Sequence, residues 1–185
     1  MFLGEAQASG GRVIWLFGLS GAGKTTLAEA LSLRLRTLGT SVTRLDGDDL
    51  RQGLCADLGF DAESRSENLR RAAHVARLMS DTGATVVCSF VTPFERDRER
   101  IREILGDRLM LVHIATSLEE CERRDPKGLY RRARRGDLPE FTGISSPFEN
   151  SRSADLVLST EESSVADLVD MVSGQLRLPK LEYVI

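Results

Sequence analysis

The apolar residues of this chain gather in five short runs separated by longer segments. The runs are RVIWLF (12–17), SVTRL (41–45), TVVCSF (85–90), LMLVHIA (109–115) and ADLVL (154–158). Each is short and rich in β-branched or other apolar residues, a pattern that is typical of buried strands. We therefore expect five strands.

The longer segments between these runs have helical spacing. Leu27, Ala28, Leu31 and Leu35 recur on one stripe, which predicts a helix over 25–38. The same reasoning predicts helices over 64–82, 94–105 and 165–176, and one that starts at Ser117, where SLEE has the form of a capping box. Strands that alternate with helices predict an α/β fold, with a parallel sheet covered on both faces as a three-layer αβα sandwich. Ligands of such sheets bind at the carboxyl ends of the strands.

The composition is ordinary for a soluble domain, with 185 residues, 41% of them hydrophobic and a net charge of −3. We expect one domain over 12–178, a disordered lead-in over 1–11 and a tail over 179–185. The mild acidity disfavours a general nucleic-acid binder, and no apolar run is long enough to span a membrane. The start has no signal-peptide pattern. Three cysteines without a CxxC pair favour a reduced, cytoplasmic interior.

The segment GLSGAGKT (18–25) matches G-x-x-x-x-G-K-[ST] between a predicted strand and a predicted helix. In this context, backbone N–H groups and the helix N-terminus bind phosphate oxygens. Lys24 is expected to reach the β- and γ-phosphates of a nucleotide, and Thr25 to bind Mg²⁺. The chain has only three lysines, at 24, 127 and 180, among 25 basic residues, so a lysine here indicates a need for its compact charge. The fold expected is therefore that of a P-loop NTPase.

A second cluster of polar residues follows the second strand, in LDGDDLRQGL (45–54). Asp46, Asp48 and Asp49 would lie beside the phosphate loop, where one carboxylate can orient a metal or accept a proton from an attacking hydroxyl. Arg51 could pair with an acceptor phosphate. The alternative is that these acidic residues only cap a helix. The chain has no N-K-x-D guanine signature, and no Asp closes the third strand.

The next segment, DLGFDAESRSENLRR (57–71), carries Phe60 ahead of a helix with Arg65 and Asn68 on one face. These residue types suit a nucleotide base and its phosphate, although a surface lattice of Arg and Glu remains an alternative.

One stretch is strongly basic. Residues 123–135 contain seven basic residues and one acid, Asp125. The stretch could grip nucleic acid, form a solvated helix, or close over a small polyanion.

Six motifs, in this order, resemble the adenylylsulfate kinase family from about Val13 to about Asn150. They are GLSGAGKTT, LDGDDLR, DLGF with SRSENLRR, FVTPFERDRERIR, LEECERRDPKGLYRRARRG and FTGISSPFE. The resemblance implies an enzyme that uses ATP and Mg²⁺ to phosphorylate the 3′-hydroxyl of adenosine 5′-phosphosulfate. It also implies a homodimer that binds neither nucleic acid nor membrane.

The resemblance assigns roles to matching positions. Lys24 and Asp46 would be catalytic, Thr25 and Asp46 would hold the metal, and Thr92 would be a possible phosphorylated residue. Residues expected to bind ATP are Gly18, Leu19, Ser20, Gly21, Ala22, Gly23, Lys24, Thr25, Thr26, Arg131 and Arg134. Residues expected to bind the acceptor are Asp46, Asp48, Arg51, Phe60, Arg65, Asn68, Val91, Thr92, Lys127 and Phe141, with the two phenylalanines on either side of the adenine. Residues 123–147 would form a mobile basic lid.

The chain departs from the family pattern at three places: Ser64 replaces a frequent Asp, Thr92 replaces a frequent Ser, and the residues after Glu149 lack the usual prolines. These departures keep open a kinase of the same architecture with another nucleotide acceptor. Two further alternatives are a nucleotide-binding module without turnover, and a nucleic-acid-binding protein that uses residues 123–135.

Overall fold

Five parallel strands form one sheet in the computed structural model, which describes residues 11–176. The strands are β1 (Val13–Phe17), β2 (Val42–Asp46), β3 (Thr85–Phe90), β4 (Leu109–Ile114) and β5 (Leu156–Leu158), in the order β2-β3-β1-β4-β5. All four strand pairs are parallel. The five predicted strands are confirmed, and Asp46 proves to be the last residue of β2. The predicted lead-in, apart from Gly11, and the predicted tail lie outside the described residues.

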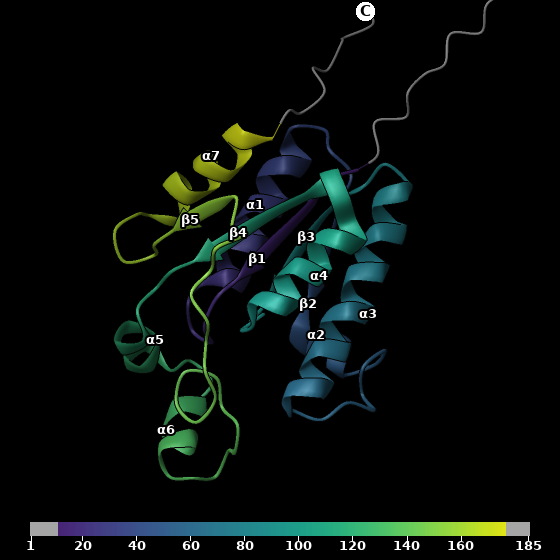
Figure 1. The fold of residues 1–185 in the computed structure, drawn as a ribbon. Coiled ribbons are helices and arrows are strands. Elements are labelled where there is room, and N and C mark those ends of the chain that lie inside the picture. Colours follow the sequence, from purple (N-terminus) through teal and green to yellow (C-terminus); the bar gives the residue numbers. More distant parts are fainter. Residues whose placement is uncertain (1–10, 177–185) are drawn as a thin grey trace, which may run out of the picture.

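Helices cover both faces of the sheet, as predicted. Helices α1 (Lys24–Thr37) and α7 (Val165–Gln175) pack on one face, and α3 (Ala62–Asp81) and α4 (Glu95–Leu105) on the other (Figure 1). Successive side chains of β1 point to opposite faces of the sheet and pack into the two cores. Ile14 and Leu16 join the core under α1, whereas Trp15 and Phe17 join the core under α3 and α4. This is the three-layer sandwich of a P-loop NTPase-type fold.

The capping box predicted at Ser117 is only half formed. Helix α5 (Leu118–Arg124) begins as expected, because the Ser117 hydroxyl accepts a hydrogen bond from the Glu120 backbone N–H. The Glu120 carboxylate does not reach back to Ser117, since it pairs with Arg123 and Arg124. The Ser117 N–H donates instead to the carboxylate of Glu161. A long-range contact therefore replaces the local one.

Three short elements were not among the expected helices: α2 (Gly47–Arg51), the 3₁₀ helix η1 (Gly106–Arg108) and α6 (Leu129–Arg134). Helices at α2 and α6 were open only as alternatives. All three elements span too few residues to show a clear hydrophobic period. Helices α5 and α6 project beyond the carboxyl ends of the strands, away from the sandwich (Figure 1). The predicted lid thus contains a helix.

The cysteines and the helices add two further observations. Cys55, Cys88 and Cys121 are all free and buried. Within residues 11–176, every helix is too short or too polar to cross a membrane.

Candidate active site

The glycines of the phosphate loop adopt backbone angles that other residues avoid. Gly21 and Gly23 have φ of 77° and 97°, in the left-handed region. At Gly18 a Cβ atom would lie 2.5 Å from the Ile114 carbonyl oxygen. Glycine therefore permits the tight turn from β1 into the N-terminus of α1, where backbone N–H groups can bind an anion.

Lys24 is folded back over this loop. Its Nζ donates to the Leu19 carbonyl at 2.7 Å, and the residue is only 9% exposed. Burial lowers the pKa of Lys24 to about 8, although the nearby Asp46 and Asp48 carboxylates oppose the shift. A bound polyphosphate would place compensating negative charge beside this ammonium group.

Asp46 is hydrogen-bonded to three segments at the mouth of the sheet. Its Oδ2 accepts from the hydroxyls of Thr25 (3.2 Å) and Ser89 (2.6 Å), and its Oδ1 accepts from the Asp48 backbone N–H (2.9 Å). The last bond caps α2. The parallel register places Ser89 opposite Asp46 on the neighbouring strand. The predicted proximity of Asp46 and the phosphate loop is thus present in the structure.

Ser89 was not among the predicted site residues. The signal in the sequence was a hydroxyl next to the last residue of the strand TVVCSF. Its role depends on strand order, because only the pairing of β2 with β3 brings it to Asp46.

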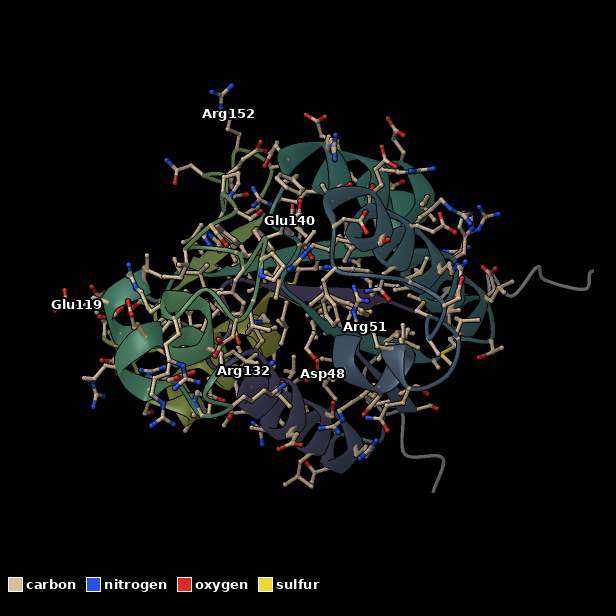
Figure 2. All side chains as sticks on the ribbon, turned by 90° about the horizontal axis from the view of Figure 1, so that it is seen from below. Asp48, Arg51, Glu119, Arg132, Glu140 and Arg152 are labelled. Atoms are coloured by element: carbon tan, nitrogen blue, oxygen red, sulfur yellow. The ribbon has the colours of Figure 1, made fainter. Side chains whose placement is uncertain are left out.

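A cavity of about 1,110 Å³ opens beside the phosphate loop and Asp46. It lies between the sandwich and the lid, and Asp48, Arg51 and Arg132 face toward its centre in Figure 2, whereas Glu119 and Arg152 point outward. All the predicted acceptor residues line it: Asp46, Asp48, Arg51, Phe60, Arg65, Asn68, Val91, Thr92, Lys127 and Phe141.

The acceptor side of the cavity is built around Phe60. The guanidinium of Arg51 lies 4.4 Å from the ring centroid and that of Arg65 lies 5.9 Å from it. Arg65 also donates to the Phe60 carbonyl and to the Glu140 carbonyl, which joins α3 to the lid. Asn68 is buried, and its Oδ1 has no hydrogen-bond partner within the described residues. The residue lines the cavity, but this oxygen is itself buried.

Two further contacts join the lid to the sandwich at the cavity. The Lys127 ammonium pairs with the Asp48 carboxylate, and the Tyr130 hydroxyl donates to the Ser20 carbonyl of the phosphate loop at 2.9 Å. Phe141 stands edge-on to the Tyr130 ring at 5.1 Å. Both faces of the predicted acceptor site, Phe60 and Phe141, therefore line one cavity.

The lid arginines fall into two groups. Arg131 and Arg134 were predicted to bind ATP, yet they pair with Asp125 and Glu122 and do not line the cavity. Arg124 and Arg132 do line it. Arg124 is committed to Glu120 and Thr160, but within residues 11–176 the Arg132 side chain has neither a hydrogen bond nor an ion pair.

Thr92 occupies an unusual backbone position. Its φ is 46°, it is only 1% exposed, and its hydroxyl accepts a hydrogen bond from Trp15 Nε1 at 3.0 Å. Phosphorylation of Thr92 would require this hydroxyl to leave its bond. The phosphorylated role remains a prediction.

Comparison with known proteins agrees with this geometry. The family profile described as adenylylsulphate kinase matches residues 10–159. An adenylyl-sulfate kinase of Paraburkholderia xenovorans (strain LB400) is 52% identical over 170 residues, which cover 92% of this chain and 95% of the relative.

Solved structures give the same result. An APS kinase of Mycobacterium tuberculosis in complex with AMPPNP and APS aligns with a TM-score of 0.86 at 41% identity, covering 89% of this chain and 96% of that chain. A hexameric APS kinase from Thiobacillus denitrificans aligns with a TM-score of 0.67 at 26% identity, covering 89% of this chain and 28% of that chain. Because the profile match spans well over half of its residues, this chain belongs to the adenylylsulphate kinase family.

Proposed function

We propose that this kinase transfers the γ-phosphoryl group of ATP to the 3′-hydroxyl of adenosine 5′-phosphosulfate, giving ADP and 3′-phosphoadenosine 5′-phosphosulfate. One observation carries the proposal: the phosphate loop and the acceptor residues open into the same cavity, with Asp46 between them. Its volume of about 1,110 Å³ exceeds the ~300–1,000 Å³ that is common for one small ligand. Two nucleotides can meet there.

The donor side suits the triphosphate of MgATP. The amides at the start of α1 and the Lys24 ammonium are the groups that bind the phosphates in this type of loop. Thr25 and Asp46 supply adjacent hydroxyl and carboxylate oxygens, a donor set that fits Mg²⁺, which takes few protein ligands and completes its shell with phosphate and water. When bound, the ion would neutralise charge on the β- and γ-phosphates.

The chemical step needs one proton acceptor. The 3′-oxygen attacks the γ-phosphorus as the bond to the β–γ bridging oxygen breaks, and ADP leaves. We assign the hydroxyl proton to Asp46, because this carboxylate stands beside the phosphate loop at the boundary of the acceptor side. Thr25 and Ser89 hold its Oδ2 in place, so the carboxylate is oriented before the substrates arrive.

The acceptor side offers aromatic surface and fixed positive charge. An adenine between Phe60 and Phe141 would lie near Arg51, Arg65 and Lys127, which could bind the phosphosulfate. Asn68 lines the same side of the cavity.

The assembly and compartment follow the resemblance. We propose a homodimer in the cytoplasm, and three free thiols support a reducing compartment. The hexameric relative shows that other assemblies occur among APS kinases.

The acceptor is tested by ADP release from MgATP with adenosine 5′-phosphosulfate, AMP, CMP or no acceptor. We expect turnover only with the phosphosulfate, and a product phosphorylated at the 3′-position, because two guanidinium groups and Lys127 line the acceptor side. Turnover with another nucleotide instead would overturn the assignment of the acceptor, whereas the assignment as a kinase would stand.

The lowered pKa of Lys24 predicts that nucleotide binding takes up protons. A bound polyphosphate favours the charged amine, so its pKa rises from about 8 on binding. Binding of AMPPNP with Mg²⁺ near pH 8 should therefore take up about half a proton, and less near pH 6.5, where the amine is already charged. Calorimetry in two buffers with different ionisation enthalpies measures this uptake.

Lys24→Arg is the matched control, since a guanidinium stays charged over this range. It should show no uptake near pH 8. Zero proton uptake by the unaltered protein at this pH would contradict the assignment of Lys24 as a phosphate-binding group with a lowered pKa.

Arg132 is expected to contribute more to ATP use than Arg131 or Arg134. A charged phosphate contact is worth about 1.5–3 kcal/mol, so Arg132→Ala should lower kcat/KM for ATP by roughly 10- to 150-fold. Steady-state kinetics of Arg132→Ala and Arg131→Ala compare the two, with Arg123→Ala as an outward-facing control that should stay within about twofold of the unaltered enzyme. A larger loss in Arg131→Ala than in Arg132→Ala would restore the original prediction.

A further inference from the structure

Arg98 is a fully buried cation that the proposed mechanism does not use. It lies in the first turn of α4 and is 0% exposed. Its guanidinium stacks near two rings, with the carbon 4.7 Å from the Phe17 centroid and 5.1 Å from the Phe148 centroid. A charge in this position is costly unless its donors are satisfied, so its hydrogen bonds indicate what it does.

Arg98 joins two segments that are far apart in sequence. Its Nε donates to the Thr92 carbonyl at 3.1 Å, and its Nη2 donates to the carbonyls of Pro93 (2.9 Å) and Glu149 (2.8 Å). Its Nη1 pairs with the Glu95 carboxylate. One planar guanidinium therefore fixes the loop after β3 and the chain that returns from the lid.

The first segment, Val91–Pro93, forms a wall of the cavity. Thr92 holds a left-handed φ of 46°, a conformation that costs about 1–3 kcal/mol in a residue other than glycine. Surrounding bonds must maintain it. Arg98 holds its carbonyl, Trp15 holds its hydroxyl, and the Val91 carbonyl accepts from Gly18 at the start of the phosphate loop.

The second segment, Phe148–Glu149, is the base of the return from the lid. The Glu149 N–H donates to the Pro93 carbonyl at 2.9 Å, and the Glu149 carboxylate accepts from the Glu95 N–H at 2.6 Å. Figure 1 shows this part of the chain running from α6 back toward β5, past the end of the sheet nearest the lid. Phe141, on the acceptor side of the cavity, precedes it by seven residues.

We propose that Arg98 is a positioning residue for the acceptor nucleotide: it locks the cavity wall Val91–Pro93 to the base of the lid return at Phe148–Glu149. The two acceptor walls then keep one spacing. The phosphate loop shares only the Gly18–Val91 bond with these walls and is otherwise held by its own glycines, Lys24 and Tyr130. Arg98 does not contact the reacting atoms. This inference rests on the proposed two-nucleotide reaction.

Arg98→Lys tests the role. Lysine keeps the positive charge but presents one ammonium, which cannot bond in plane to three carbonyls between two rings. We expect the KM for the acceptor to rise at least tenfold, while the Kd for MgATP, measured separately by calorimetry, changes less than twofold. The assay uses whichever acceptor the unaltered enzyme turns over, so failure of the phosphosulfate assignment is seen first in the unaltered enzyme.

Arg102→Lys is the matched control. Arg102 lies one turn further along α4 and bonds to Ser153 and Asp155, away from the cavity. The same substitution there should leave both constants within about twofold.

If Arg98→Lys does not fold, Phe148→Leu tests the proposal instead. This substitution removes one of the two rings that flank the guanidinium, and it should raise the KM for the acceptor without changing the Kd for MgATP. Equal losses for both nucleotides, or lower stability with an unchanged acceptor KM, would overturn the proposal.

Discussion

The hydrogen bonds at Asp46 depend on the parallel order of three strands. Because β2 pairs with β3 and β3 pairs with β1, the carboxyl ends of all three meet at one edge of the sheet. The Asp46 carboxylate there accepts from Thr25 of α1 and Ser89 of β3. The proposed ATP site and the proposed acceptor-nucleotide site therefore both adjoin the Asp46 side chain. A change of strand register would separate its carboxylate from the phosphate loop.

The proposed reaction accounts for the basic lid of an acidic chain, because it brings two polyanions into one cavity. Neighbouring carboxylates neutralise much of its charge: Arg123 and Arg124 pair with Glu120, and Arg134 pairs with Glu122. These pairs are at least partly open to solvent, so each contributes little to stability, about 0–1 kcal/mol. Arg132 keeps its charge available at the cavity, and the Lys127–Asp48 pair can exchange its carboxylate for a substrate anion. A closed lid would also exclude water from the transfer.

Sequence patterns predicted the sheet, its covering helices and the phosphate loop, because hydrophobic period and glycine spacing are local signals. Part of the acceptor side also followed from residue patterns, whereas Val91, Lys127 and Phe141 came from the resemblance to the family. What they missed depends on distant contacts. Ser89 lies beside Asp46 only because β2 and β3 pair. Arg132 differs from Arg131 only in the direction that it faces on α6. The Ser117 N–H donates to the distant Glu161 carboxylate instead of the Glu120 carboxylate. In the sequence Arg98 is one of several arginines in a charged helix, and only its burial in the structure distinguishes it from the others.

The central claim is that Asp46 serves the chemical step and not only the cap of α2. The most direct measurement is kcat of Asp46→Asn at saturating ATP and acceptor, beside Asp170→Asn on α7 as a surface control. Asparagine keeps an oxygen that can cap α2 but is not a proton acceptor at neutral pH, so we expect an unchanged unfolding temperature and a kcat about 10²- to 10⁴-fold lower. A folded Asp46→Asn variant with a kcat within about threefold of the Asp170→Asn control would contradict the claim.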